Sequence, residues 1–173
     1  MNHPAKIPLA RINAMSAGEF SRAFGAVYEH SAWIAERAFV HRPFTSVADL
    51  HAAMKTAVVQ ASAAEQLALL RAHPELAGRE ARAGELTASS SAEQRSAGLD
   101  ALSADEVARI AALNRAHADR FGFPFIIAVR LASKAEVFSE LERRLGLDRD
   151  AEMGACLEQV FRISDLRLRD LIE

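Results

Sequence analysis

With 173 residues, half of them hydrophobic and a quarter charged, the chain is long enough to bury a hydrophobic core without disulfides or structural metals. Its formal net charge of −2 excludes the strongly basic surface that binders of nucleic acid and anionic lipid need. Its one cysteine, Cys156, excludes an internal disulfide and a thiolate metal cluster, and the apolar helical pattern around it favours a small buried packing residue.

Hydropathy along the chain predicts a protein that neither crosses a membrane nor carries a targeting segment. The apolar runs fall short of the roughly 18–20 residues that span a bilayer. Residues 1–15 have too few consecutive apolar residues for a secretory signal, and the last three residues do not match the peroxisomal Ser-Lys-Leu address. We therefore expect a cytoplasmic protein.

The composition favours helices throughout, because glycine and proline are few while alanine, leucine, glutamate and arginine are abundant. In the first half of the chain, capping residues and prolines mark where each helix begins and ends. A short helix is expected over residues 7–15, and the third helix should end before Pro43. The expected helix starts are Pro8, Ser16 with its capping partner Glu19, Trp33, and Ser46 with Asp49, followed by a further helical run that leads to His73.

The second half begins with a polar connection after His73 that shows no apolar period. Beyond it, Ser90 or Ser91 is expected to start a short helix that ends near Gly98. Two capping boxes and a glycine stop then predict longer helices. These helices are expected from Ser103 with Glu106 to about Phe121, from Ser133 with Glu136 to Gly146, and from about Arg149 to the C-terminus.

Residues 121–130 depart from the helical pattern. The apolar run over residues 123–129 is rich in aromatic and β-branched side chains and contains Pro124. Because no partner strand is evident, we interpret the run as an extended, irregular segment whose amides and carbonyls need partners that a bound heterocycle could supply. The sequence thus predicts a single compact all-α domain over residues 1–173 with an irregular segment near residues 121–130.

His73 stands where a helix should end, because the residue before Pro74 is disfavoured in the α region. The unpaired carbonyls at a helix end favour the protonated imidazole and keep it near titration at neutral pH, which suits a general acid or base. The alternative is a surface histidine that caps the helix and adds about 0.3–1 kcal/mol to its stability. The local pattern alone favours this alternative.

Glu93 also has two interpretations, which depend on where its helix begins. If Ser90 is the N-cap, Glu93 closes a capping box and bonds back to the cap backbone. If Ser91 is the N-cap, Gln94 closes the box and Glu93 can face a pocket. Only the second register leaves Glu93 available for catalysis.

Arg167 lies at the edge of the apolar stripe of the last expected helix, so its guanidinium should be partly buried and should need an anionic partner. A substrate carboxylate, matched by the planar guanidinium, would serve. The alternative is exposure or pairing with a nearby acid, which the local pattern favours. The acids in question are Asp165, Asp170 and Glu173.

The remaining histidines show no spacing typical of a metal site, and the chain lacks HExxH, GxSxG, phosphate-binding and dinucleotide-binding patterns. We therefore expect no metal and no cofactor. Any chemistry should be acid–base or electrostatic work by the side chains and backbone.

Several short stretches, each weak alone, occur together in one order and spacing. They are Tyr28-Glu-His-Ser-Ala-Trp33, His73-Pro-Glu-Leu76, Ser90-Ser-Ala-Glu-Gln94 with Ala97-Gly-Leu-Asp100, Asn114 with Phe121-Gly-Phe-Pro-Phe-Ile-Ile127, and Leu166-Arg-Leu168. In this combination, over nearly the whole chain, they resemble the OHCU decarboxylases, which act on 2-oxo-4-hydroxy-4-carboxy-5-ureidoimidazoline (OHCU) in urate breakdown. The chain departs from that family at His117, where tyrosine is common. It also departs at Arg130-Leu131, where the pair Arg-Gly is frequent.

The resemblance implies an all-helical fold and a cofactor-free conversion of OHCU into (S)-allantoin with loss of carbon dioxide, and it suggests a homodimer. It implies that His73 is the catalytic histidine, that Glu93 is its acidic partner and that Arg167 binds the substrate. It assigns further substrate contacts to Pro74, Ser90 and Gln94, and main-chain contacts to the segment that contains Phe123, Phe125, Ile126 and Ile127.

The resemblance reverses the preference for the structural interpretations of His73, Glu93 and Arg167. Two alternatives stay open at this point. One is a non-catalytic helical interaction module in which His73 and Glu93 only cap helices. The other is an enzyme on the same scaffold that acts on another ureido or imidazole substrate.

Overall fold

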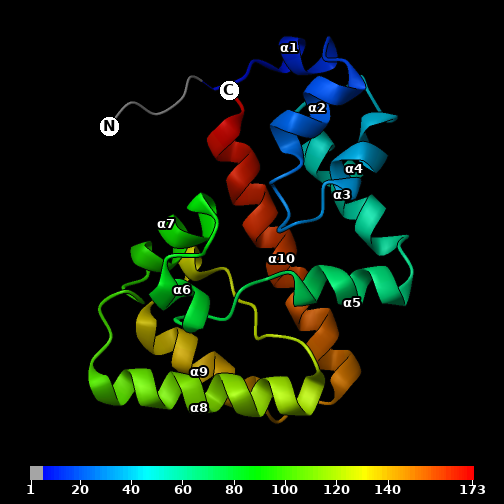
Figure 1. Cartoon of the computed structure of the whole chain (residues 1–173). Coiled ribbons are helices and arrows are strands. Elements are labelled where there is room, and N and C mark those ends of the chain that lie inside the picture. The colour runs from blue at the N-terminus through cyan, green and yellow to red at the C-terminus, as the bar shows by residue number, and fades with distance from the viewer. Residues whose placement is uncertain (1–5) are drawn as a thin grey trace. The chain divides into compact units, whose positions relative to one another are not determined.

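The structure, a computed structural model, describes residues 6–173 with the exception of the Arg82 side chain. Regular structure in that range is helical apart from one isolated parallel bridge, so the predicted all-α class is confirmed (Figure 1). In chain order the helices are α1 (Leu9–Asn13), α2 (Ala17–Phe24), α3 (Trp33–Phe39), α4 (Val47–Val59), α5 (Ala63–Arg71), α6 (Arg79–Ala83), α7 (Ala88–Ser96), α8 (Ala104–Phe121), the 3-10 helix η1 (Val129–Leu131), α9 (Lys134–Arg144) and α10 (Arg149–Leu171).

Internal contacts divide the chain into two compact units. The first unit combines Met1–Ala72 with Phe161–Glu173, and the second consists of His73–Val160. Helix α10 therefore contributes residues to both units. The single domain over residues 1–173 stays a prediction.

Capping boxes begin several helices as predicted. The side chain of Ser16 accepts a hydrogen bond from the backbone of Glu19, whose carboxylate returns one to the Ser16 backbone. The boxes at Ser103 and Ser133 have the same reciprocal geometry. A fourth box, at Ser62, starts α5 and follows the same Ser-x-x-Glu pattern. These local bonds satisfy amides that the first helical turn leaves without intrahelical partners.

The core of the first unit is built around a phenylalanine cluster where α2, α3 and α4 pack together (Figure 1). The ring of Phe20 lies 4.8 Å from Phe24, 5.5 Å from Phe39 and 6.1 Å from Phe44, measured between ring centroids. Ile7 forms the parallel bridge with Ile172, near the end of α10. The first unit thus joins helices from the start of the chain to its last residues.

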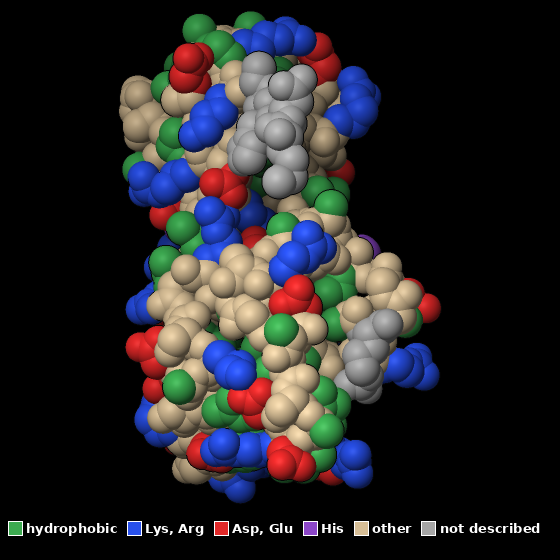
Figure 2. All heavy atoms as spheres, turned by 90° about the vertical axis from the view of Figure 1, so that its left-hand side faces the viewer, with side chains coloured by type: hydrophobic (Ala, Val, Ile, Leu, Met, Phe, Trp, Pro, Cys, Tyr) green, Lys and Arg blue, Asp and Glu red, His purple; other side chains and the backbone are tan. Residues whose placement is uncertain are grey.

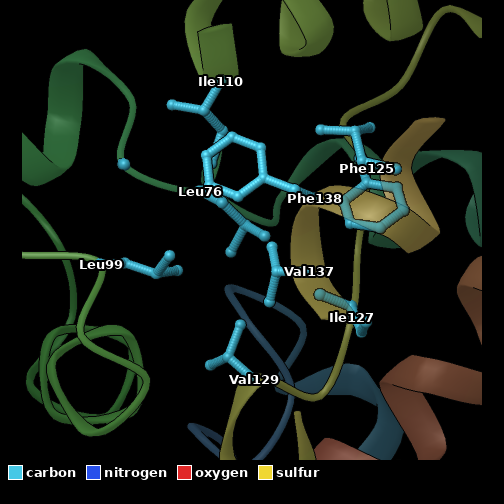
Figure 3. Packing of buried hydrophobic residues seen from close by; sticks show 10 residues of the cluster. Leu76, Leu99, Ile110, Phe125, Ile127, Val129, Val137 and Phe138 are labelled. Atoms are coloured by element: carbon cyan, nitrogen blue, oxygen red, sulfur yellow. The ribbon is translucent and has the colours of Figure 1, made fainter. Parts of the chain in front are cut away.

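A hydrophobic cluster forms the core of the second unit, and Figure 3 shows side chains of α8 and α9 pointing toward Leu76. Leu76 lies in the turn that begins with His73, so this turn is anchored in the core. The cluster consists of Leu76, Ala77, Leu99, Ile110, Phe125, Ile127, Val129, Val137, Phe138 and Leu141.

The irregular segment expected near residues 121–130 is confirmed. Helix α8 ends at Phe121, and its C-cap Gly122 has the positive φ of 80° that glycine adopts without strain. The described backbone over residues 124–128 is in neither helix nor strand. Phe125 and Ile127 point into the hydrophobic cluster, so the segment runs through the core of its unit.

The helices of the described residues do not combine the length and hydropathy of a membrane span. None of the helices within residues 6–173 has the length and hydropathy needed to cross a bilayer. On the face that Figure 2 shows, basic and acidic side chains are interspersed, in keeping with the net charge of −2.

The first unit is expected to become less stable as the pH falls, because of His51. Its Nε2 donates to the carbonyl oxygen of Phe161 at 3.0 Å and lies 3.1 Å from Oγ of Ser164. Burial lowers the pKa of His51, and the smaller opposing effect of Asp165 does not restore it. The unfolded chain therefore binds a proton more readily, so this contribution to stability is complete above about pH 6.5 and is lost as the pH falls further.

Urea unfolding between about pH 7.5 and pH 5 measures this dependence. His51→Asn should flatten the loss of unfolding free energy with falling pH. His41 is exposed, so His41→Asn should keep the slope of the unchanged protein. If unfolding free energy falls with pH equally in the His51→Asn protein and the unchanged protein, His51 is not the cause of the pH dependence.

Candidate functional site

His73 follows the end of α5, whose C-cap is Ala72, so the helix ends beside Pro74 as predicted. The side chain of His73 is buried, with only 8% of the residue exposed. The alternative of a surface capping histidine is therefore wrong. A buried imidazole at the beginning of a turn is shielded from bulk water, which strengthens its interactions with any group that it contacts.

Two buried amide side chains hold the turn that follows His73. Gln94 of α7 accepts a hydrogen bond from the Ala77 amide at 2.9 Å and donates to the Glu75 carbonyl at 3.5 Å. Asn114 of α8 donates to the Leu76 carbonyl at 2.9 Å. Two helices thus fix the backbone of a turn whose own backbone hydrogen bond, from the Gly78 amide to the Glu75 carbonyl, is 3.3 Å long.

The turn is also conformationally tight. Ala77 has a φ of 48°, in the left-handed region that alanine rarely adopts. A Cβ atom added to Gly78 would lie 2.7 Å from the Cβ of Glu75, which is closer than real side chains approach. Backbone strain of this kind persists only where the surroundings over-determine it, and here Gln94 and the core contacts of Ala77 do so.

Helix α7 begins earlier than either predicted register. Its N-cap is Thr87, whose side chain accepts a hydrogen bond from the Ser90 amide at 3.2 Å. Both expectations, Ser90 as N-cap and Ser91 as N-cap, are wrong. Glu93 lies in the second turn of α7, where it is half-buried, so it does not close a capping box with the N-cap. The polar connection before α7 also contains a short helix, α6, that the sequence pattern did not predict.

Thr87→Ala is expected to lower the unfolding free energy by about 1 kcal/mol, because it removes the hydroxyl that accepts from the first turn of α7. Ser91→Ala is the matched control, since Ser91 lies inside the helix and alanine has the better helix propensity. Urea unfolding of both variants measures the difference. A larger loss in Ser91→Ala than in Thr87→Ala would contradict the observed cap.

The other predicted site residues of the second unit lie on the elements just described. Ser90 and Gln94 are buried on α7, and Pro74 is half-buried beside His73. The predicted segment residues Phe123, Phe125, Ile126 and Ile127 are buried. Because the side chains of Phe125 and Ile127 belong to the core, the backbone is the part of this segment suited to bind a ligand.

Arg167 belongs to the first unit and is buried there, with 6% of the residue exposed. Its Nη2 donates to Oε1 of Glu29 at 2.9 Å, and its Nη1 donates to the Val27 carbonyl at 3.3 Å. Arg167 is thus buried and has an anionic partner within the protein, whereas its binding of a substrate carboxylate stays a prediction. In these bonds the partner of Arg167 is none of the acids proposed as alternatives, which were Asp165, Asp170 and Glu173. Asp165 forms an ion pair with Arg169.

The pairing of Arg167 with Glu29 was not predicted from the sequence. Glu29 lies 138 positions from Arg167 in the chain, and no helical spacing links the two. The adjacent Tyr28 is likewise buried, accepts a hydrogen bond from Ser164 of α10 at 3.0 Å and has its pKa raised by burial to about 12. The stretch from Val27 to Glu29 is therefore fastened to α10 by backbone and side-chain contacts, and this fastening orients the guanidinium.

Residues 6–173, as far as the structure describes them, contain no group of three histidine, cysteine or acidic side chains that could hold a metal ion. Cys156 is buried, as predicted for a packing residue, and burial raises the pKa of its thiol to about 12. The polar side chains that bond to the turn after His73 are the amides of Gln94 and Asn114.

Comparisons with known proteins agree with the fold and with the sequence resemblance. The family model described as OHCU decarboxylase matches residues 13–169. A 2-oxo-4-hydroxy-4-carboxy-5-ureidoimidazoline decarboxylase of Haloferax volcanii is 42% identical over 165 residues, covering 95% of this chain and 96% of the relative. The enzyme of the same name from Mus musculus is 40% identical, covering 95% of this chain and 92% of the relative.

Two solved structures are similar in three dimensions. The crystal structure of an (S)-allantoin synthase matches with a TM-score of 0.79 and 31% identity over 98% of this chain and 54% of its own. A crystal structure of an OHCU decarboxylase in the presence of (S)-allantoin matches with a TM-score of 0.69 and 20% identity over 91% of this chain and 98% of its own, which supports the fold. From the family match and these identities, the chain belongs to the OHCU decarboxylase family.

Proposed function

We propose that this protein is a carbon–carbon lyase that decarboxylates OHCU to (S)-allantoin in urate breakdown. The family match over residues 13–169 carries the proposal. The buried His73 and its rigid turn support it, because acid–base catalysis needs a titratable group held in one orientation.

The reaction needs no cofactor on chemical grounds. The bond between the carboxylate carbon and the ring carbon breaks, and its electron pair moves into the adjacent imine of the imidazoline ring. Carbon dioxide leaves an enol, in which the hydroxyl-bearing carbon is doubly bonded to the ureido-bearing carbon and the former imine nitrogen takes up a proton. The enol hydroxyl then loses its proton and becomes a carbonyl, while a proton is delivered from one face to the ureido-bearing carbon, which gives one enantiomer. Since the ring itself takes up the electron pair, the protein has only to orient the carboxylate, stabilise the charge on the ring and control the proton.

In this mechanism His73 handles the proton transfer that accompanies loss of carbon dioxide. Glu93, half-buried on α7, accepts hydrogen bonds from the hydroxyl or ureido edge of the substrate. Arg167 binds an anionic group of the substrate, a role that the planar guanidinium suits. The observation that Glu93 lies beyond the capping turn of α7 supports its assignment.

Pro74, Ser90 and Gln94 line the proposed substrate pocket, and the backbone of residues 123–127 contacts the ligand. The burial of Ser90 and Gln94 supports this assignment, because polar groups in a buried site discriminate strongly between ligands. Gln94 also bonds to the turn after His73, so one side chain would link substrate binding to the placement of the imidazole.

The proposal extends to the setting of the enzyme. In this proposal, the protein acts on a small molecule in the cytoplasm as a homodimer. It binds neither nucleic acid nor membranes. The interspersed charges and the net charge of −2 support the last two points. Sedimentation equilibrium on the purified protein tests the dimer.

The deciding experiment generates OHCU from urate with urate oxidase and hydroxyisourate hydrolase and follows circular dichroism as allantoin forms. Addition of this protein should accelerate the appearance of the (S)-allantoin signal in proportion to its concentration. An unchanged rate would refute the decarboxylase assignment and leave a non-catalytic helical module. Acceleration with another ureido or imidazole compound, and none with OHCU, would indicate a related enzyme.

A further inference from the structure

The second unit contains a fully buried ionic network that the proposed mechanism does not use. Arg144, Glu152 and His117 are 1%, 0% and 0% exposed. The guanidinium of Arg144 bonds to both carboxylate oxygens of Glu152, with Nη2 to Oε1 at 2.6 Å and Nε to Oε2 at 2.9 Å. Nε2 of His117 lies 2.7 Å from the same Oε1. We call these three residues the ionic network.

The network keeps its carboxylate charged. Burial by itself would raise the pKa of Glu152, but hydrogen bonds from His117 and Arg144 outweigh that effect and hold the pKa below its usual value. Burying such charges is costly, and a hydrophobic trio of similar volume often gives equal or greater stability. Stability alone is therefore a weak reason for this arrangement.

Two further donors of the network reach the irregular segment, and Nη2 of Arg144 also donates to Sγ of Cys156 at 2.9 Å. Nη1 of Arg144 donates to the Ile126 carbonyl at 2.8 Å, and Nδ1 of His117 donates to the Phe123 carbonyl at 3.1 Å. The guanidinium also lies 4.4 Å over the ring of Phe125. The irregular segment has no helical or strand bonding over residues 124–128. The ionic network thus holds two of the segment's carbonyls and one of its rings.

These bonds also set the direction of an amide. A trans peptide unit is planar, so the carbonyl of one residue and the N–H of the next point in opposite directions. Because the Ile126 carbonyl faces Arg144, the N–H of Ile127 points away from the network. The side chain of Ile127 lies in the hydrophobic cluster, which further prevents rotation of this peptide unit.

We propose that Arg144, Glu152 and His117 are positioning residues for catalysis, because they fix the peptide unit between Ile126 and Ile127 in the orientation that binds substrate. The inference rests on the proposed function, in which the backbone of residues 123–127 contacts OHCU. It adds that the guanidinium of Arg144 orients this backbone through its hydrogen bond to the Ile126 carbonyl. Lysine cannot replace it, because one ammonium cannot bond along both edges as the guanidinium does.

Arg144→Lys tests the role against a closely matched control. Arg143 is the preceding residue on α9 and pairs with Glu140, but it is exposed, so Arg143→Lys makes the same change outside the core. With OHCU as substrate, we expect Arg144→Lys to raise KM roughly tenfold and to change kcat by less than about threefold, since the lost interaction is made with the bound substrate throughout. Arg143→Lys should leave both constants unchanged.

Hydrogen exchange provides a readout that does not depend on activity. In Arg144→Lys, amides of residues 125–128 should exchange faster, while those of residues 137–141 in α9 should keep their protection. Glu152→Gln is the second variant, because its amide preserves the shape of the carboxylate if Arg144→Lys fails to fold. It should show the same local change in exchange and the same rise in KM, reduced to about threefold.

The outcomes separate the two hypotheses. If the unchanged protein does not accelerate allantoin formation, the proposed function fails before any variant is compared. If it is active and a folded Arg144→Lys or Glu152→Gln protein keeps its KM, the positioning role is overturned. Faster exchange throughout the second unit, with unchanged kinetic constants, would likewise reduce the network to a structural element.

Discussion

Replacing His73 with alanine is expected to lower kcat/KM for OHCU by about 10²–10⁴-fold, the usual contribution of a general acid or base. The loss should appear mainly in kcat, because in the proposed mechanism the imidazole acts on the proton that moves during the reaction. The buried site should lose only about 1–2 kcal/mol of unfolding free energy, so the variant should stay folded. The circular-dichroism assay and urea unfolding measure the two effects separately.

His41→Ala is the control for this experiment, because His41 is an exposed histidine of the first unit. It should retain the activity of the unchanged protein. The assignment of His73 would be wrong if the alanine variant kept more than about a tenth of the activity, since that corresponds to less than ~1.4 kcal/mol of transition-state stabilisation.

Arg167→Met is expected to have two effects that can be separated. It removes the guanidinium that pairs with Glu29, a side chain only 2% exposed, and loss of one member of a buried ion pair costs about 3–5 kcal/mol. It should also lower kcat/KM by roughly 10²–10³-fold, because the substrate loses the cation that is proposed to orient it. Kinetics are to be measured below the unfolding temperature of the variant.

The double variant Arg167→Met with Glu29→Gln separates the loss of stability from the loss of activity. Neutralising Glu29 removes the buried charge that Arg167→Met leaves without its guanidinium, so much of the lost stability should return. Activity should not return, because the double variant still lacks the cation. Recovery of kcat/KM together with stability would mean that Arg167 serves only to hold the stretch from Val27 to Glu29.

Local signals predicted most of the fold. Capping boxes such as Ser103 with Glu106 mark helix starts correctly because the bonds involved join residues three positions apart. The start of α7 was missed because its third residue is Ser90, so Thr87 caps it without the glutamate that completes a recognisable box. Helix α6 was missed because it spans only Arg79–Ala83 and has too few apolar residues to show a period.

The site was predicted less completely, since its supports come from distant parts of the chain. Burial of His73 depends on a turn held by Gln94 and Asn114, and no local pattern reveals that support. The pairing of Arg167 with Glu29 is equally remote. The buried position of His117 could have been found, because Ile110, Asn114, His117 and Phe121 repeat at helical spacing along one face of α8. Its partners Arg144 and Glu152 could not have been inferred from that stripe.

During synthesis, the two units are completed in the reverse of their order along the chain. The second unit is contiguous, so all of its residues exist once Val160 has been added. The first unit begins earlier but must wait for residues 161–173, which bring Ser164 to Tyr28 and Arg167 to Glu29. A nascent chain that stops before Phe161 would thus contain His73 and its supporting turn, yet it would lack the arginine assigned to the substrate.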